Sequence, residues 1–343
     1  MHYKKPSSIF ALSMLSAALI AMPTQAEESV TVYGKIHVSG DYIDNGDTTD
    51  VAIGSNSSRI GFKGKKDLKH NLKAIWKLES DIDASGERGD LKARNRYLGL
   101  SHKAGTLIVG YHDTPFKKLG ASAGVFHDTI AERRGILGAG DGSNKMNIRA
   151  KNGVLYESPK WNNVQIKLLR SSGDDTDTSL DENSVTSASI QYKSKNYYAG
   201  VAYEEQTKPS VDAEGLRVGG GAKFGDTKVN LIYENLTSET NNKFERAAYG
   251  GSVAHKLGDI TVKAQVFVAD DYKDKSDSGG MIWGLGADYK LDKAFTVYGV
   301  IAGVENDENS NIVLAGSGHG EKYKPAAAGD SMMGVSGGMI YKF

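Results

Sequence analysis

The sequence predicts an all-β fold, specifically a transmembrane 16-stranded antiparallel β-barrel. Three observations predict it. Short segments in which apolar and polar residues alternate follow one another along most of the chain. The connections between them are alternately short, and long and polar. The chain also ends in Phe343, an aromatic residue that closes such an alternating segment. Strands with two unlike faces, with short turns at one rim and long loops at the other, are typical of a membrane-spanning barrel.

The N-terminal residues predict export. Lys4 and Lys5 precede an apolar stretch over residues 9–22, and Thr24, Gln25 and Ala26 form a small-residue cleavage site. This order of basic, apolar and small residues is typical of a signal peptide. An uncleaved anchor is the alternative, but the apolar stretch is short for a membrane span. We therefore expect a signal peptide over residues 1–26 and one barrel domain over residues 27–343.

Composition excludes several kinds of protein. The chain has 42 basic and 42 acidic residues, so it has no net charge with which to attract nucleic acid. It has no cysteine, which excludes disulfides and cysteine–zinc sites. After the signal peptide no run of apolar residues is long enough for a transmembrane helix. The 41 glycines and 6 prolines suit strands joined by tight turns. No metal and no cofactor are expected.

The first mature segment, residues 29–42, shows the alternation clearly. Its apolar side chains on one face are Val30, Val32, Ile36 and Val38. Its polar side chains on the other are Thr31, Tyr33, Lys35, His37, Ser39 and Asp41. A period of two residues is that of a β-strand with one apolar and one polar face.

The same pattern recurs along the chain and is plainest over residues 260–268. Strands are expected to begin near residues 30, 57, 71, 92, 106, 149, 164, 185, 197, 216, 227, 246, 260, 279, 295 and 331. A soluble sandwich or propeller is the alternative, but the even strand number, the unequal loops and the lack of an internal repeat count against it. A barrel of sixteen strands is too wide for side chains to fill, so a water-filled interior is expected.

Several segments resemble a known family. In order, SVTVYGKIHVS, SSRIGFKGKKDL, LKAIWKLES, RNRYLGLS, AGTLIVGYHDTPF, NGVLYESPKW and the final YKF resemble the trimeric Gram-negative general porins of proteobacteria. The resemblance implies a homotrimer in the bacterial outer membrane that passes ions and small hydrophilic solutes by passive diffusion. It also implies a third extracellular loop inserted into each pore, a surrounding of outer-membrane lipid and lipopolysaccharide, and insertion by the barrel-assembly machinery. Tyr341 and Phe343 resemble the C-terminal assembly signal of Gram-negative outer-membrane proteins.

One long connection suits the role of an inserted loop. No convincing strand occurs over residues 114–148, which form the third connection on the long-loop rim. Long loops are usually functional or disordered. Apolar residues such as Phe126 and Ile130 disfavour a solvated loop, so we expect this one to pack against the inner barrel wall. The stretch DTIAERRG is compatible with a short helical turn capped by Asp128.

The resemblance implies that the pore is narrow where a basic cluster on the wall faces acidic groups on the inserted loop, and strand alternation indicates which basic residues point inward. The predicted basic wall consists of Arg59, Lys63, Lys77, Arg94, Arg96 and Arg149. The predicted constriction loop contributes Asp128, Glu132, Arg133 and Arg134. Opposed charges across a narrow aqueous gap select ions and orient dipolar solutes. The excess of cations favours a weak anion preference. It stays open whether Arg133 and Arg134 face the solute or bind the wall.

The alternation of inward and outward side chains along a strand conflicts with the assignment of two residues of this set. Arg94 and Arg96 fall on the same face as Leu98 and Leu100, which should meet lipid. A β-bulge, or a position near the rim, would resolve the conflict.

Three other functions remain as alternatives. The first is a substrate-specific channel, for example one selective for anions or phosphate. The second is an enzyme in a barrel, but none of the histidines lies in a GxSxG or HExxH motif, so no enzymatic activity is expected. The third is a surface adhesin or phage receptor that uses the acidic outer loops.

Overall fold

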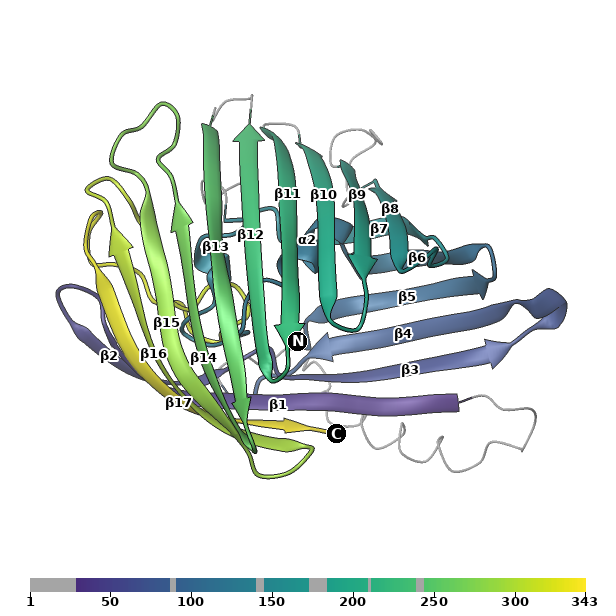
Figure 1. Cartoon of the computed structure of the whole chain (residues 1–343), viewed down its shortest axis with the longest axis horizontal. Coiled ribbons are helices and arrows are strands. Elements are labelled where there is room, and N and C mark those ends of the chain that lie inside the picture. Colours follow the sequence, from purple (N-terminus) through teal and green to yellow (C-terminus); the bar gives the residue numbers. More distant parts are fainter. Residues whose placement is uncertain (1–28, 87–90, 140–144, 173–183, 209–210, 239–243) are drawn as a thin grey trace, which may run out of the picture.

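The computed structural model describes residues 29–86, 91–139, 145–172, 184–208, 211–238 and 244–343, and the predicted signal peptide lies outside them. Within these ranges seventeen strands form one antiparallel sheet that curls into a barrel (Figure 1). The strands are β1 (Ser29–Asp44), β2 (Thr49–Ser55), β3 (Arg59–Asp67), β4 (Lys73–Asp81), β5 (Ala93–His102), β6 (Gly105–Asp113), β7 (Arg149–Glu157), β8 (Val164–Ser171), β9 (Ser184–Lys193), β10 (Tyr197–Lys208), β11 (Val211–Phe224), β12 (Thr227–Ser238), β13 (Phe244–Leu257), β14 (Ile260–Ala269), β15 (Gly280–Lys290), β16 (Phe295–Asn306) and β17 (Met332–Lys342). The helical pieces are α2 (Pro115–Gly120) and the 3-10 turns η1 (Lys69–Asn71) and η2 (Arg133–Gly135).

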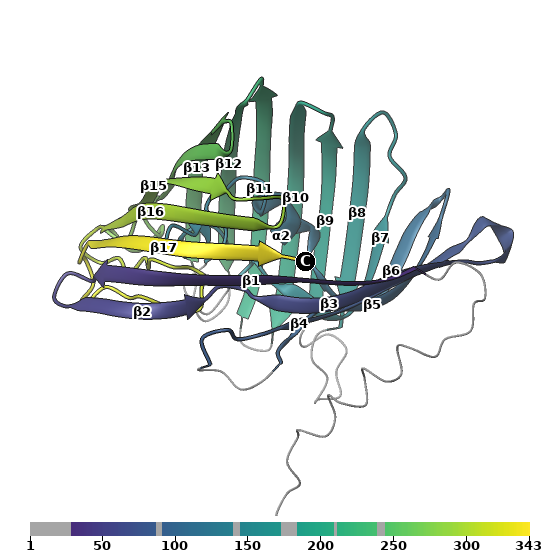
Figure 2. The same cartoon turned by 90° about the horizontal axis from the view of Figure 1, so that it is seen from below.

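The barrel closes through its first strand. One edge of β1 pairs with β17, from Lys35 opposite Lys342 to Asp44 opposite Met333. Its other edge pairs with β2 at one end and with β3 at the other (Figure 2). Because β2 and β3 share one place in the ring, seventeen strands fill sixteen positions, and the predicted 16-stranded barrel is confirmed.

The break between β2 and β3 is the first of two differences between the predicted strands and the structure. Ser57 adopts a positive φ of 47°, which interrupts the ladder. The backbone N–H of Asn56 still donates to the carbonyl of His37 on β1, 2.8 Å away, so the two pieces stay in line. A second difference lies at β11, which begins at Val211 and not near residue 216.

The two faces of the wall are inverted relative to a soluble protein. On β12, Leu231 is 65% exposed and Tyr233 46%, whereas Asn230 before them and Glu234 after them are fully buried. Exposed apolar side chains recur on every side of the ring, including Val51, Leu98, Leu216, Leu285 and Val335. An apolar belt on the outside of a closed sheet is stable where it meets lipid tails, because closure leaves no unpaired strand edge.

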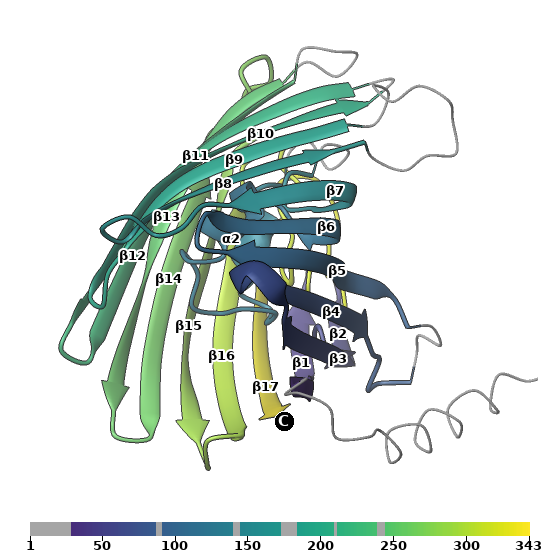
Figure 3. The same ribbon diagram turned by 90° about the vertical axis from the view of Figure 1, so that its right-hand side faces the viewer.

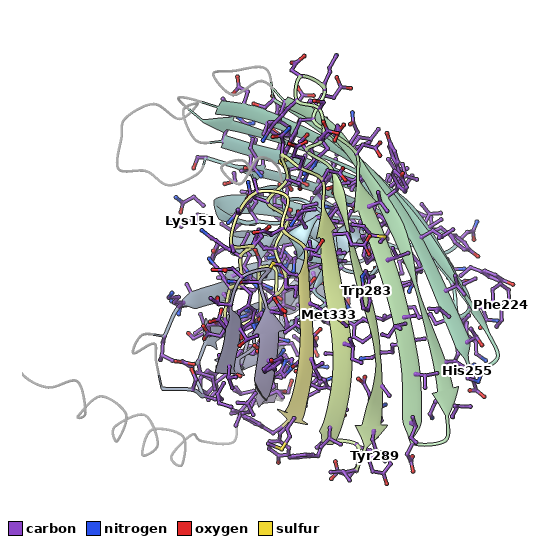
Figure 4. The ribbon with its side chains drawn as sticks, turned by 90° about the vertical axis from the view of Figure 1, so that its left-hand side faces the viewer. Lys151, Phe224, His255, Trp283, Tyr289 and Met333 are labelled. Carbon is purple, nitrogen blue, oxygen red and sulfur yellow. The ribbon has the colours of Figure 1, made fainter. Side chains whose placement is uncertain are left out.

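Aromatic residues mark the ends of this apolar belt. Near the short turns the exposed aromatic side chains are Trp161, Tyr192, Tyr197, Phe224, Tyr289, Tyr341 and Phe343. Near the long loops they are Tyr42, Tyr203, Tyr233 and Tyr249. Figure 4 shows Phe224, His255 and Tyr289 at the short-turn ends of their strands, with Trp283 farther along the wall. Such girdles are typical of the two boundaries between a membrane and water.

The space inside the barrel is partly filled by segments that connect its strands. Residues of the β6–β7 connection, among them Phe126, Ile130 and Ile136, form one buried cluster with side chains of β12–β17. Helix α2 forms a second buried cluster with β10, β11 and β12, and lies within the ring of strands (Figure 3). None of the helices in the described ranges is long and apolar enough to cross a membrane.

Candidate functional site

The β6–β7 connection begins with a capped helix. Thr114 precedes α2 and its hydroxyl accepts a hydrogen bond from the Lys117 N–H at 3.2 Å, while Pro115 occupies the first helical position. Both residue types are favoured there because a Thr oxygen satisfies a free N–H and proline needs no donor at that place. The Thr-Pro pair is a sequence signal for the start of a helix, but we did not predict this helix from it.

Helix α2 is fixed to the wall by Arg217 of β11. The Arg217 guanidinium donates to the carbonyl of Phe116 at 2.8 Å and lies 3.8 Å from the centroid of its ring. Arg217 itself forms a fully buried ion pair with Glu234 of β12. A buried charge is tolerated when its donors are used by a carboxylate and a carbonyl, as here.

Farther along, the connection crosses to the opposite wall. Gln265 of β14 accepts a hydrogen bond from the Val125 N–H at 3.1 Å and donates to the carbonyl of Ala131. Ser252 of β13 donates to the carbonyl of Ala123 at 2.5 Å. Gln265 and Ser252 are buried, on the side of their strands opposite to the exposed apolar residues. The segment therefore lies against the polar inner face of the ring.

Four charged residues that we predicted for this segment form one buried cluster. Asp128 accepts from Lys35 of β1 and from Arg134, each at 2.9 Å. Glu132 accepts from Arg133 at 2.7 Å and from Arg134 at 3.0 Å, and its other contact is the Asp128 N–H at 2.7 Å. The Glu132 side chain is 0% exposed, so its assignment as an acid that faces the solute is wrong. Its carboxylate is used entirely inside the loop.

The two arginines differ in role. Arg133 is 5% exposed and donates to the carbonyl of Gly120 at 2.8 Å, so it binds the end of α2 and does not line a pore. The Arg134 side chain is 15% exposed, and it stays beside a solvent-filled space while holding Asp128 and Glu132. Asp128 does not cap η2, because its φ is 59° and Glu132 occupies the position before the turn.

Electrostatics keep this cluster ionised. Burial alone would raise the pKa of Asp128, but the Lys35 ammonium and the Arg134 guanidinium outweigh it and lower the pKa far below its ordinary value. Burial also opposes ionisation of Glu132, yet Arg134 and Arg133 lower its pKa to about 2. Desolvation by the packed segment around it, followed by the Arg133 charge, lowers the pKa of His127 to about 4, while part of the side chain reaches solvent. A neutral His127 fits its contact, in which Nδ1 accepts from Arg133 at 3.2 Å.

A second connection also folds inward. Leu314 and Ala315 of the β16–β17 connection are buried, and the Ala315 N–H donates to the carbonyl of Ile130 at 2.8 Å. The inner wall holds this connection through Asp41 of β1, which lies 3.1 Å from His319 Nε2 and 3.1 Å from the Tyr323 hydroxyl. The sequence pattern predicted the inward fold of the 114–148 segment, but it did not predict this second inward segment.

Five of the six residues of the predicted basic wall lie on β3, β4 and β5, and the sixth, Arg149, lies on β7. The Lys63 and Lys77 ammonium groups sit 5.2 Å and 5.3 Å from the centroid of the Tyr33 ring. Arg94 pairs with Glu79 at 2.8 Å and Asp81 at 3.1 Å. The structure thus brings these three cations together around Tyr33 and Glu79.

Arg59 and Arg149 flank that group differently. Arg59 stands opposite Lys35 in the β1–β3 ladder, so it points to the same inner side, and no ion pair ties it within the described ranges. Arg149 lies at the loop end of β7 and pairs with Asp113 at 3.0 Å, next to Lys117 at 2.8 Å from the same carboxylate oxygen. Arg149 is therefore part of a separate ion-pair group beside α2.

Arg96 is the wrong member of the predicted wall. The β4–β5 register shifts between Leu78 and Ser80, which inserts one extra residue into β5. The bulge turns Arg94 inward while Arg96 stays opposite Leu78, whose side chain is exposed on the outer face. There Arg96 donates to the Ser80 hydroxyl at 2.7 Å. A bulge shifts the alternation by one residue, which is why two positions of equal parity face opposite ways.

Sequence reasoning missed Lys35 and Arg217 as residues that hold the inner segments. Lys35 lies on the polar face expected for the first strand, so its inward direction was predictable. Its pairing with Asp128, 93 residues away, was not. Arg217 carries no local signal of its contact with α2.

The C-terminal residues lie on the outer face. Tyr341 and Phe343 are 43% and 48% exposed, and their rings are 6.0 Å apart. Phe343 exchanges backbone hydrogen bonds with Gly34 of β1, at 2.8 Å and 3.2 Å. Their role as an assembly signal stays a prediction. Over the described ranges, no group of three or more acidic or histidine side chains is arranged to hold a metal ion.

The fold and the site define a class of protein, a membrane channel. A closed sheet with an apolar exterior and girdled rims carries a polar inner face and two inward segments. The chain belongs to the Gram-negative porin family, whose model matches residues 11–309. It is an outer-membrane channel for the passive diffusion of solutes.

Individual relatives agree with this family. The chain is 25% identical over 308 residues to a major outer membrane protein P.IB of Neisseria gonorrhoeae, covering 78% of this chain and 84% of that protein. It is 24% identical over 347 residues to the P.IB protein of Neisseria meningitidis serogroup B strain MC58, covering 92% and 97%.

Two solved structures share the fold. One is an anion-selective porin from Comamonas acidovorans, with a TM-score of 0.79 at 22% identity over 92% of this chain and 100% of that one. The other is in-vitro folded OmpT of Vibrio cholerae in its trimer form, with a TM-score of 0.71 at 16% identity over 93% and 100%.

Proposed function

We propose that the channel is a general diffusion pore with a weak preference for anions, set where the two inward segments narrow the space beside the basic wall. The observation that carries this proposal is the pairing of the acids. Asp128, Glu132 and Glu79 are each bound to cations, whereas Arg59 and Lys63 have no carboxylate partner within the described ranges. Unpaired charge of one sign beside a narrow passage selects ions of the other sign.

The anion-selective porin from Comamonas acidovorans supports the sign of this preference. The narrow passage itself is inferred from two connections that meet at Ile130 and Ala315 and reach inner-wall residues of β1, β13 and β14. No role as an enzyme is proposed, because the charged side chains of the site are used to hold the two inward segments or stand along the passage.

The environment of the channel follows from the family. We propose a homotrimer, surrounded by outer-membrane lipid and lipopolysaccharide and inserted by the barrel-assembly machinery after removal of residues 1–26. The trimer form of OmpT supports the oligomeric state. Small outward residues on the first and last strands, Gly34 and Gly337, are the candidates for close contact between subunits. Gly34 is covered by the Phe343 ring of its own chain, since a Cβ there would lie 2.3 Å from it. Gly337 is open on the same outer side, so we propose the contact between subunits there.

The test of the selectivity compares two arginines. Reversal potentials under a salt gradient in planar bilayers are measured for the native protein, Arg59→Ser and Arg133→Ser. We expect Arg59→Ser to move the reversal potential towards cation preference by removing an unpaired charge of the passage. Arg133→Ser should not move it by that route, because Arg133 is buried.

Cation preference in the native protein, unchanged in Arg59→Ser, would overturn the proposed selectivity. An equal shift in both variants would indicate that loop displacement, and not local charge, sets the potential.

A further inference from the structure

Exposed lysines stand around the short-turn mouth of the channel. They belong to β3, β9, β11, β12, β13, β15 and β17 and lie at the short-turn ends of these strands. We call them the mouth lysines: Lys65, Lys193, Lys223, Lys228, Lys256, Lys290 and Lys342. Three of them, Lys223, Lys256 and Lys290, directly neighbour residues that Figure 4 labels at the short-turn ends of the strands. The set reaches most of the way around the ring of strands.

The strand register places these lysines on the inner side of the wall. Lys342 stands opposite Lys35, which pairs with Asp128 inside the barrel. Lys193 stands opposite Tyr198, whose hydroxyl donates at 3.0 Å to a carbonyl of the inward β6–β7 connection. Residues directly opposite each other in an antiparallel ladder point to the same face of the sheet. Lys342 and Lys193 therefore point to the lumen.

The alternation along β13, β14 and β15 gives the same direction for two more mouth lysines. Lys263 of β14 lies 4.6 Å from the centroid of a phenylalanine ring of the β6–β7 connection, and it pairs with Asp288. Lys290 follows Asp288 by two residues and shares its inner face. Lys256 stands opposite Thr261, two residues before Lys263, and shares that face as well.

Two mouth lysines face each other across one ladder. Lys223 and Lys228 stand directly opposite in the β11–β12 register, and the buried Asn230 of the inner face follows Lys228 by two residues. Like charges directly opposite each other destabilise a sheet, so this pair does not contribute to the stability of the barrel. Lys65 follows Lys63 by two residues on β3 and continues the basic wall towards the mouth.

Nearby acids do not neutralise the mouth lysines. None of the seven forms an ion pair in the part of the chain that the structure describes. The strand carboxylates near this mouth already have cationic partners of their own: Asp67 with Lys73, Glu157 with Lys167 and Asp288 with Lys263. The short turns add exposed residues of both signs, the acids Asp226, Asp259 and Asp292 and lysines that include Lys103, Lys195 and Lys293. The short-turn mouth therefore carries an excess of positive charge.

The long-loop end of the channel has the opposite charge balance. Acidic residues outnumber basic ones in the described connections over residues 45–48, 270–279 and 307–331, and Asp277 and Asp307 among them are exposed. A mouth lined by one sign of charge raises the local concentration of ions of the other sign. The two entrances therefore attract ions of opposite sign.

We propose that the mouth lysines collect small inorganic anions such as chloride and make the channel conduct asymmetrically, with more current when anions move from the short turns to the long loops than in the opposite direction. Anions driven in past the lysines come from a region in which they are concentrated. Anions driven in from the long loops come from a region in which acidic side chains deplete them. The proposal rests on the proposed diffusion pore, but it depends on the two mouths and not on the narrow passage.

The range of these charges sets the conditions of the test. The Debye length is about 30 Å at 0.01 M salt and about 3 Å at 1 M. Currents of single channels are measured at equal and opposite voltages in symmetric KCl at these two concentrations. We expect the larger current to exceed the smaller by about twofold in dilute salt, and the ratio of the two to fall to about one in 1 M KCl.

The direction of the asymmetry requires the orientation of each channel. Ser276→Cys is introduced into every protein, because Ser276 is exposed in the β14–β15 connection and the native chain has no cysteine. After biotin labelling of this thiol, streptavidin changes the current only when it is added on the side of the long loops. The larger current is expected when anions move away from the short-turn side.

Two triple variants separate local charge from net charge. Lys193→Gln/Lys223→Gln/Lys228→Gln removes three mouth lysines and should bring the current ratio in dilute KCl towards one. The matched control Lys275→Gln/Lys322→Gln/Lys324→Gln removes three exposed lysines from the long connections and should keep or raise the ratio. Both variants lose the same net charge, and both are expected to conduct like the native channel in 1 M KCl, where the charges are screened.

Equal currents at the two voltages in dilute KCl, or the larger current in the opposite direction, would overturn the asymmetric mouth and leave the diffusion pore intact. An equal fall of the ratio in both triple variants would also overturn it, because net charge and not the mouth would then set the asymmetry. A native protein that conducts no KCl current would instead contradict the proposed function.

Discussion

At the scale of single residues, charge in the passage is decided by which carboxylates are already paired. Asp128 and Glu132 read as free acids in the sequence, yet each has two cationic partners in the fold. Removing one partner of a buried pair leaves an uncompensated charge and costs about 3–5 kcal/mol. The cluster therefore holds the inward segment in place. It does not supply free negative charge opposite the basic wall.

The same cluster predicts how acid loosens the segment. The lowered pKa of Glu132, about 2 against an ordinary 4.5, stabilises the folded segment fully above about pH 4.5, and this stabilisation is lost as pH falls towards 2. The lowered pKa of His127, about 4 against 6.5, means that acid favours the released state between pH 6.5 and 4. We expect current fluctuations of single channels to increase through both windows.

His127→Gln separates the two windows. It removes the titration between pH 6.5 and 4, where a protonated ring would lose its hydrogen bond from Arg133, and it leaves the lower window in place. Fluctuations that are constant from pH 7 to pH 3 in the native channel would contradict this reading of the cluster.

At the scale of elements, the two inward connections hold each other at a close backbone contact. Gly316 faces Gly135 and Arg134 so closely that a Cβ would lie 2.5 Å from the Gly135 nitrogen and 2.7 Å from the Arg134 carbonyl carbon. Both contacts are to backbone, which cannot rotate away. A side chain here must push the connections apart, at a cost of about 1–3 kcal/mol.

Gly316→Ala is therefore expected to widen the passage. Liposome swelling with sugars of increasing size should show entry of larger sugars than in the native protein, with a higher single-channel conductance. Gly299→Ala is the matched control, since a Cβ there meets nothing within 4 Å. An unchanged size limit in Gly316→Ala would mean that these two connections do not set the narrowest point.

At the scale of the whole molecule, closure of the ring depends on the meeting of its two ends. The β1–β17 ladder continues past Lys342 as Phe343 bonds to Gly34, and the Phe343 ring fills the space above that glycine. Closure removes the edges that a sheet would otherwise expose to lipid. The C-terminal aromatic residue is thus also a structural part of the barrel closure between β1 and β17.

Gly34→Ala is expected to weaken this closure. Its Cβ would lie 2.3 Å from the Phe343 ring and 2.9 Å from the Arg59 carbonyl oxygen, so ring or strand must shift. We expect less of the heat-modifiable folded form on gels of unboiled protein. Gly40→Ala on the same strand is the control, because its nearest neighbour would be an ordinary contact at 3.6 Å. Equal yields of the two variants would contradict a role for Phe343 in closure.

The sequence by itself determined the barrel. Alternation with a period of two fixes which side chains face lipid, and the turn residues fix where each strand ends, so strand starts such as Arg149, Val164, Tyr197 and Ile260 were predictable from local pattern alone. It also predicted the inward direction of Lys63, Lys77 and Arg94, and the segment that leaves the wall.

Only the tertiary structure decided which charges remain free. The bulge in β5 turns Arg94 inward and leaves Arg96 on the outer face. Asp41 binds His319 of the β16–β17 connection, and Lys35 forms an ion pair with Asp128. These are contacts between residues far apart in the chain, and hydrophobic periodicity carries no information about them. The lipid-facing pattern repeats along every strand, whereas the partner of a buried charge depends on where two distant segments meet across the barrel.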